Sequence, residues 1–181
     1  LNLVNWCFPN IDGCSSISRA GRYYPVKFFF KPLMFVYAIF LSIFWKKMYD
    51  LLRNENIPIS KLYLLTALCS VLFLALYIIF LGEGNYYRFF RQIGIFIFIF
   101  FTVLSQILYS IKLKKLSCFN YKLKNKQSFY AICIGVIGLF LLPFVIFEIV
   151  EIKNFKNIVS WNYFFLMQIY FLIIFFGLRK N

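Results

Sequence analysis

The chain has 181 residues, of which 62% are hydrophobic and 23% aromatic, and its mean hydropathy is +0.78. A soluble domain of this length cannot bury so much apolar surface, which excludes a soluble globular protein and indicates a membrane protein. A net charge of +14 would suggest nucleic acid in a soluble domain, but here the basic residues flank apolar segments on both sides and form no single groove, which argues against a nucleic-acid partner.

Residues 1–27 are predicted to form an ordered polar loop that precedes the first membrane helix. The part from Cys7 to Pro25 contains two cysteines, two prolines, two glycines and three serines, which is turn chemistry. Six residues separate Cys7 from Cys14, and this gap can close into a disulfide in an oxidising compartment. Both a Cys7–Cys14 disulfide and two free thiols fit this spacing.

Five apolar stretches follow, each near the roughly 20 residues that a bilayer requires. They predict membrane spans at about 28–47, 61–82, 92–112, 127–149 and 157–178. The connectors are short, so consecutive helices are expected to be antiparallel neighbours. The predicted fold is therefore all-α, a polytopic membrane helical bundle forming one integral membrane domain over residues 1–181.

Lysine and arginine are distributed unequally over the two sides of these spans. Twelve lie on the side of the C-terminus and eight on the side of residues 1–27. Cytoplasmic loops hold the positive excess, so we expect a cytoplasmic C-terminus and an N-terminal loop in the periplasm or an organelle lumen. A bacterial inner membrane is favoured over a eukaryotic endomembrane.

The start of the chain predicts a further helix. Leu1 would lie outside the cytoplasm, yet the sequence after it shows no export signal with a basic start and an apolar core. We expect one more span before Leu1, which would give six helices in the full-length protein. An alternative start codon is the other explanation.

Candidate chemistry is limited by the absence of histidine from the whole chain. Ser-His and Cys-His nucleophile pairs and histidine-based metal sites are excluded within it, and neither a metal nor a cofactor is expected. The sequence does not define a reaction, so whether the protein is an enzyme stays open. Polar residues inside the spans, among them Gln106, Gln168, Thr102, Ser105 and Asn162, are interpreted as hydrogen-bonding contacts between helices rather than as a substrate path.

Arg88 and Arg91 lie three residues apart at the start of the third span. They can clamp a lipid phosphate, or they can anchor the helix at the membrane interface together with Tyr86 and Tyr87. At the end of the fourth span Glu148 and Glu151 share one helix face, either as a carboxylate pair or as a solvated helix end. Antiparallel packing predicts one lipid head-group site, formed by Ser18, Arg19, Arg88, Arg91 and Glu148.

The segment Ile17-Ser18-Arg19-Ala20-Gly21, followed by a membrane helix, resembles the I-S-x-x-G signature of the Frag1/DRAM/Sfk1 family, which is related to the N-terminal domain of Cwh43. The glycine-containing segment from Arg88 to Gly94 and the pair Trp161-Asn162, which opens the last helix, lie at matching positions. This resemblance implies a six-helix integral membrane protein, apparently lacking its first helix here, with eukaryotic relatives that act in GPI-anchor lipid remodelling or in autophagy and lysosome membranes.

These observations favour a multi-pass membrane protein that handles, senses or remodels membrane lipid at the outward boundary, with membrane lipids as its partners. The alternative is a non-enzymatic membrane modulator or assembly partner with a purely structural bundle, for which the sequence indicates no particular protein partner. A transporter ranks last, because the uncharged cores of the spans hold no ionisable residue near the midplane.

Overall fold

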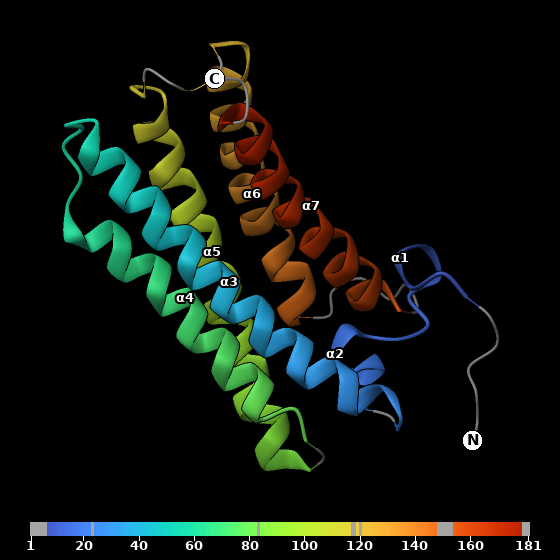
Figure 1. The fold of residues 1–181 in the computed structure, drawn as a ribbon. Coiled ribbons are helices and arrows are strands. Elements are labelled where there is room, and N and C mark those ends of the chain that lie inside the picture. The colour runs from blue at the N-terminus through green and yellow to red at the C-terminus, as the bar shows by residue number, and fades with distance from the viewer. Residues whose placement is uncertain are drawn as a thin grey trace.

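The computed structural model describes residues 7–22, 24–82, 84–116, 119, 121–147 and 154–178, and every regular element in these ranges is a helix. Two short helices come first, α1 (Pro9–Asp12) and α2 (Ile17–Ala20). Five long helices follow: α3 (Val26–Asn54), α4 (Lys61–Ile79), α5 (Asn85–Leu113), α6 (Tyr121–Phe147) and α7 (Phe155–Leu178). Figure 1 shows the long helices as one bundle with α1 and α2 at one of its ends.

Four of the long helices, α3, α4, α5 and α7, are long and apolar enough to cross a membrane. The chain is therefore an integral membrane protein with a polytopic helical bundle. The fourth predicted span, 127–149, falls on α6, where a shorter apolar section from Asn125 to Leu141 is described. This predicted span ends within residues 148–153, which lie outside the described part of the chain.

The long helices pack in chain order, α3 on α4, α4 on α5, α5 on α6 and α6 on α7. Side chains also join α3 directly to α7, because Tyr37 and Gln168 hydrogen-bond each other and the rings of Phe44 and Phe171 lie 5.1 Å apart. Helix α5 reaches α3 as well, since the rings of Trp45 and Tyr109 are 5.0 Å apart. Helix α5 is the most buried of the four candidate spans.

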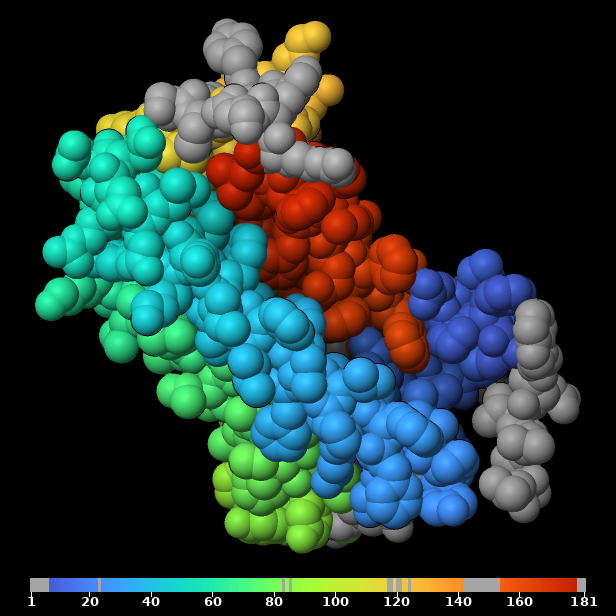
Figure 2. Space-filling view, viewed as in Figure 1, coloured from blue at the N-terminus to red at the C-terminus, as the bar shows by residue number. Residues whose placement is uncertain are grey.

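Residues 7–22, which we call the cap, are more structured than the predicted loop. Ser16 begins α2 by accepting a 3.1 Å hydrogen bond from the backbone N–H of Arg19, as is typical of a helix N-cap. Helix α1 ends at Gly13, whose left-handed φ of 60° suits glycine. Figure 2 shows the cap, coloured dark blue, against the first turns of α7, coloured orange-red.

Three helices extend well beyond the predicted spans. Helix α3 runs to Asn54, beyond the predicted limit at 47, α5 begins at Asn85 rather than near 92, and α6 begins at Tyr121 rather than near 127. The predicted spans stop where charged residues begin, but charged side chains do not end a helix. As a result, Arg88 and Arg91 lie in the first two turns of α5 and not before it.

Candidate functional site

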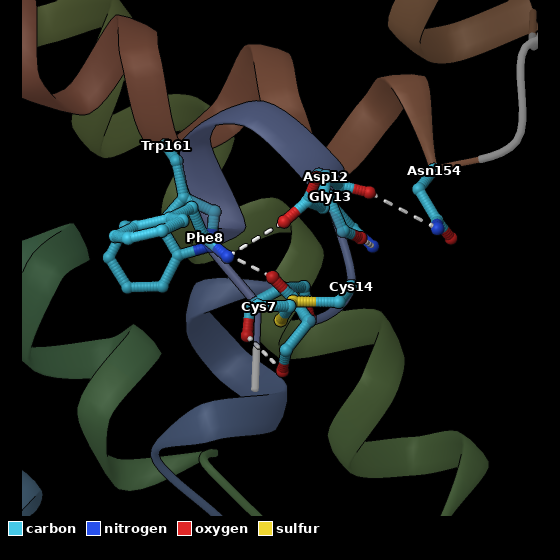
Figure 3. Close-up of a disulfide and its surroundings, with 10 residues drawn as sticks. Cys7, Phe8, Asp12, Gly13, Cys14, Asn154 and Trp161 are labelled. Carbon is cyan, nitrogen blue, oxygen red and sulfur yellow. Dashed lines mark hydrogen bonds between the residues drawn. A yellow bond between two sulfur atoms is a disulfide. The ribbon is translucent and has the colours of Figure 1, made fainter. Parts of the chain in front are cut away.

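Four side chains from the start of α7 hold the cap by donating hydrogen bonds to its backbone carbonyls. Asn157 donates to Gly13 at 2.7 Å and Trp161 donates to Ser15 at 2.8 Å. Asn162 donates to Asn10 at 2.8 Å, and Asn154 donates to Asp12 at 3.4 Å. These bonds fix the cap at one end of the bundle, as Figure 3 shows for Asn154 and Asp12.

The cap is also closed on itself. Cys7 and Cys14 are joined by a disulfide, and the backbone N–H of Phe8 donates a 2.8 Å hydrogen bond to the carboxylate of Asp12 (Figure 3). Gly13 packs so closely on α7 that a Cβ at this position would lie 2.6 Å from the carbonyl oxygen of Asn154. Only glycine fits there, which explains how the cap approaches the backbone of α7.

The cap brings Arg22 to the start of α5. The Nε of Arg22 donates a 3.1 Å hydrogen bond to the backbone carbonyl of Ser18, so α2 fixes the direction of this arginine. Arg22 is close enough to Arg91 for the two to interact electrostatically, and Arg88 also acts on Arg91. Two arginines from separate segments, Arg22 and Arg88, therefore act electrostatically on Arg91 at this end of the bundle.

Arg91 is the most unusual member of this group, because only 8% of its surface is exposed. Its Nη1 donates a 2.9 Å hydrogen bond to the backbone carbonyl of Gly82, in the α4–α5 connection. Among the described residues, no carboxylate pairs with Arg22, Arg88 or Arg91. A largely buried cation with like charges beside it is costly unless an anion accompanies it.

The predicted interfacial anchors are present beside the arginines. Tyr86 and Tyr87 are exposed, and the rings of Tyr86 and Phe90 lie 4.8 Å apart. The ring of Phe80 stacks on Phe90 at the same distance. Exposed aromatic rings suffice for anchoring, whereas the buried position of Arg91 is not that of an interfacial anchor.

The structure relates some of the predicted site residues to one another and not others. Arg88 and Arg91 interact electrostatically, whereas Ser18 is related to them only through Arg22, which bonds its backbone carbonyl, and its hydroxyl bonds that of Ser16. Arg19 is exposed on α2, and Glu148 lies outside the described residues. Arg22 was missed as a site residue, although its spacing of three from Arg19 repeats the spacing of Arg88 and Arg91.

The predicted polar contacts inside the bundle have different partners. Gln106 donates to the backbone carbonyl of Met167 and Gln168 bonds Tyr37, so both connect helices as expected. Thr102 bonds within α5, to the carbonyl of Phe98. Asn162 does not connect long helices, because it donates to the carbonyl of Asn10 in the cap and to that of Ile158 one turn back in α7. The hydroxyl of Ser105 is buried in α5 without a hydrogen bond to the protein.

A second feature is an apolar cavity of about 260 Å³ between α5, α6 and α7. Its lining includes Val103, Ile107, Gly138 and Leu139. The hydroxyl of Tyr163, which also lines it, donates to the backbone carbonyl of Ile134 at 3.1 Å. The cavity therefore offers apolar contacts and no converging charges.

Among the side chains that the structure describes, no three metal-ligating residues gather at one place. Comparison with known proteins adds no relative: no protein-family model, curated protein or solved structure matches the chain.

Proposed function

We propose that the protein binds anionic lipid head groups at the membrane boundary on the side of the cap, through Arg22, Arg88 and Arg91. The observation that carries the proposal is the burial of Arg91 beside two further arginines without a carboxylate partner in the described part of the chain. A phosphate group would neutralise this charge, and guanidinium groups bind phosphate oxygens with paired hydrogen bonds.

The position of the arginines supports a lipid rather than a soluble anion. Arg88 and Arg91 belong to the first two turns of a helix that is apolar enough to cross a membrane. Phosphates of membrane lipids lie at this depth, and the positive end of the α5 dipole adds to the attraction. Exposed Tyr86 and Tyr87 are typical of the same interfacial region.

The proposal includes a membrane topology. We infer five spans in this chain, with α6 as the fourth in order, a cytoplasmic C-terminus, and a cap in the periplasm or an organelle lumen. The excess of lysine and arginine on the side away from the cap supports this orientation. Membership of the Frag1/DRAM/Sfk1 family is a further prediction, and the head-group site does not depend on it.

The test is lipid binding by the purified protein in neutral detergent, measured by native mass spectrometry with phosphatidylglycerol and phosphatidylcholine. Arg88→Gln removes an exposed member of the group and keeps the fold intact. We expect it to weaken phosphatidylglycerol binding about tenfold, because a hydrogen bond to a charged group contributes about 1.5 kcal/mol. Arg53→Gln, which removes an exposed arginine near the end of α3, is the matched control and should change nothing.

Equal affinity of the unchanged protein for the two lipids would contradict the proposal. So would an equal loss of phosphatidylglycerol affinity in Arg88→Gln and Arg53→Gln. The alternative function, a non-enzymatic modulator or assembly partner with a purely structural bundle, would then be favoured. Glycerol phosphate serves as a further probe, since competition by it at low concentration would indicate a soluble phosphate ligand instead of a lipid.

A further inference from the structure

Polar side chains form a continuous cluster inside the bundle, in the part of α5 remote from the cap. Ser105, Gln106, Tyr109 and Ser110 of α5 are all completely buried. Around them lie Trp45 of α3, Gln127 of α6 and Tyr170 of α7. We call these seven residues the buried polar cluster. It lies among helices that cross the membrane, where polar groups depend on the protein for hydrogen bonds.

Part of the buried polar cluster already has hydrogen-bond partners in the protein. The amide nitrogen of Gln127 donates to the backbone carbonyl of Ser110 at 3.2 Å. The hydroxyl of Ser110 donates to that of Tyr170 at 2.9 Å, and Tyr170 donates to the backbone carbonyl of Gln106 at 3.1 Å. The amide nitrogen of Gln106 donates to Met167 at 3.1 Å. These bonds connect α5, α6 and α7 and fix the two glutamines.

The remaining polar atoms of the cluster have no hydrogen-bond partner in the protein. The side-chain oxygens of Gln106 and Gln127, the hydroxyls of Ser105 and Tyr109 and the indole N–H of Trp45 are buried without a hydrogen bond. Each such group costs about 1–3 kcal/mol if it stays unpaired. Rotating the amides by 180° does not help, since it would turn the oxygen of Gln106 towards the carbonyl of Met167 and that of Gln127 towards the carbonyl of Ser110.

The unpaired groups define the ligand that would satisfy them. Two are carbonyl acceptors that need a donor, and one, the indole of Trp45, is a donor that needs an acceptor. The seven residues carry no formal charge, which favours a neutral ligand; Asp50 acts electrostatically on Tyr109 from outside the cluster. Gln127 donates to the backbone of Ser110 and Tyr170 donates to the backbone of Gln106, so both glutamines lie at the same part of α5. Water is small, neutral, and both donor and acceptor.

We propose that the buried polar cluster binds internal water molecules, which donate hydrogen bonds to Gln106 and Gln127 and accept hydrogen bonds from Tyr109 and Trp45. Buried waters typically make about three hydrogen bonds to groups of this kind. The apolar cavity between the same three helices differs, because the hydroxyl of Tyr163 in its lining is already bonded to the backbone. The α5–α6–α7 interface thus combines a hydrated region with an apolar one.

X-ray hydroxyl-radical footprinting in H₂¹⁸O tests the proposal, because bound water generates radicals beside the residues that it touches. In the full-length protein in detergent, we expect Tyr109 and Trp45 to be oxidised although they are inaccessible from outside. Phe98, which is equally buried on α5, is the internal control and should stay unmodified. Incorporation of ¹⁸O that lags behind that at surface residues would show that the water exchanges slowly.

A variant separates bound water from general solvent penetration. Gln106→Met together with Gln127→Met keeps the side-chain volumes and removes both acceptors, so oxidation of Tyr109 should be lost while the protein still folds. If the double variant does not fold, the single variant Gln127→Met should reduce the oxidation of Tyr109 in the same way. Protection of Tyr109 and Trp45 equal to that of Phe98 in the unchanged protein would overturn the proposal, and so would oxidation of all three.

Discussion

Asn157 donates a 2.7 Å hydrogen bond from its side-chain amide to the backbone carbonyl of Gly13, across 144 positions of sequence. Three neighbouring side chains of α7 make equivalent bonds to the cap, but this is the shortest of the four. The bond lies beside the point where Gly13 packs on the backbone of α7. It is therefore central to how the cap is held on the bundle.

Removing this contact should loosen the cap without unfolding the bundle. We expect Asn157→Ala to lower the free energy of unfolding by about 1 kcal/mol, the usual contribution of one hydrogen bond. Hydrogen exchange followed by mass spectrometry should show faster exchange within residues 8–15 and unchanged exchange in α4. Asn54→Ala, at the exposed end of α3, is the control. Unchanged exchange in the cap would mean that the remaining three contacts suffice.

Gly13 allows a second prediction, with two substitutions at the same position. Its φ of 60° and ψ of 19° are left-handed, a conformation that asparagine adopts more readily than alanine. A Cβ on Gly13 would meet the carbonyl oxygen of Asn154 at 2.6 Å, whichever side chain carries it. Gly13→Asn should therefore lower the melting temperature about as much as Gly13→Ala does, because both variants add the same clash. A Gly13→Asn variant as stable as the unchanged protein would show that the approach of cap and α7 is adaptable.

The long helices were predictable because their apolar stretches are long, but their ends were not. Helix α5 continues seven residues before the predicted span, since Arg91 can turn its guanidinium back to the carbonyl of Gly82 and remain helical. The docking of the cap gave no signal in the sequence. Its acceptors are backbone carbonyls, which every residue has, and its donors Asn157 and Asn162 are ordinary polar residues at a helix start.

The candidate site was predictable only in part, for a related reason. Arg88 and Arg91 were recognised by their helical spacing, which a sequence displays directly. Arg22 joins them because the cap folds against the bundle, and this depends on contacts between α7 and residues more than 140 positions away. A long-range arrangement of that kind leaves no local pattern.

The contact between α3 and α7 can be measured by a double-mutant cycle. Tyr37 and Gln168 bond each other at 3.0 Å inside the membrane-spanning part of the bundle. Comparison of Tyr37→Phe, Gln168→Leu and the double variant should give a coupling energy of about 0.6 kcal/mol, the average for such bonds in membrane proteins. Ser42→Ala with Gln168→Leu is the control cycle, because Ser42 bonds within α3, and its coupling should be near zero.

The proposed orientation predicts which sites a membrane-impermeant thiol reagent can reach. With the cysteines outside the cap replaced by alanine, Ile11→Cys should be labelled from outside intact cells, since its side chain is 73% exposed. Lys122→Cys should be labelled only after permeabilisation. Labelling of Lys122→Cys in sealed cells would reverse the proposed orientation.

The disulfide should influence lipid binding although it contributes no group to the arginine site. Closing a loop of this length stabilises a folded protein by about 2 kcal/mol through the entropy of the unfolded chain. Reduction should therefore loosen the cap, and with it the position of Arg22 beside Arg91.

We expect reduction of the disulfide to weaken phosphatidylglycerol binding roughly fivefold, equivalent to about 1 kcal/mol, in the assay described above. The variant with Cys7→Ser and Cys14→Ser should bind like the reduced protein and should not respond to reductant, which controls for effects on other cysteines. The melting temperature reports how the cap stabilises the bundle, and the lipid affinity reports how the cap contributes to head-group binding. A lower melting temperature with unchanged lipid affinity would show that the cap stabilises the bundle but that Arg88 and Arg91 bind the head group without Arg22.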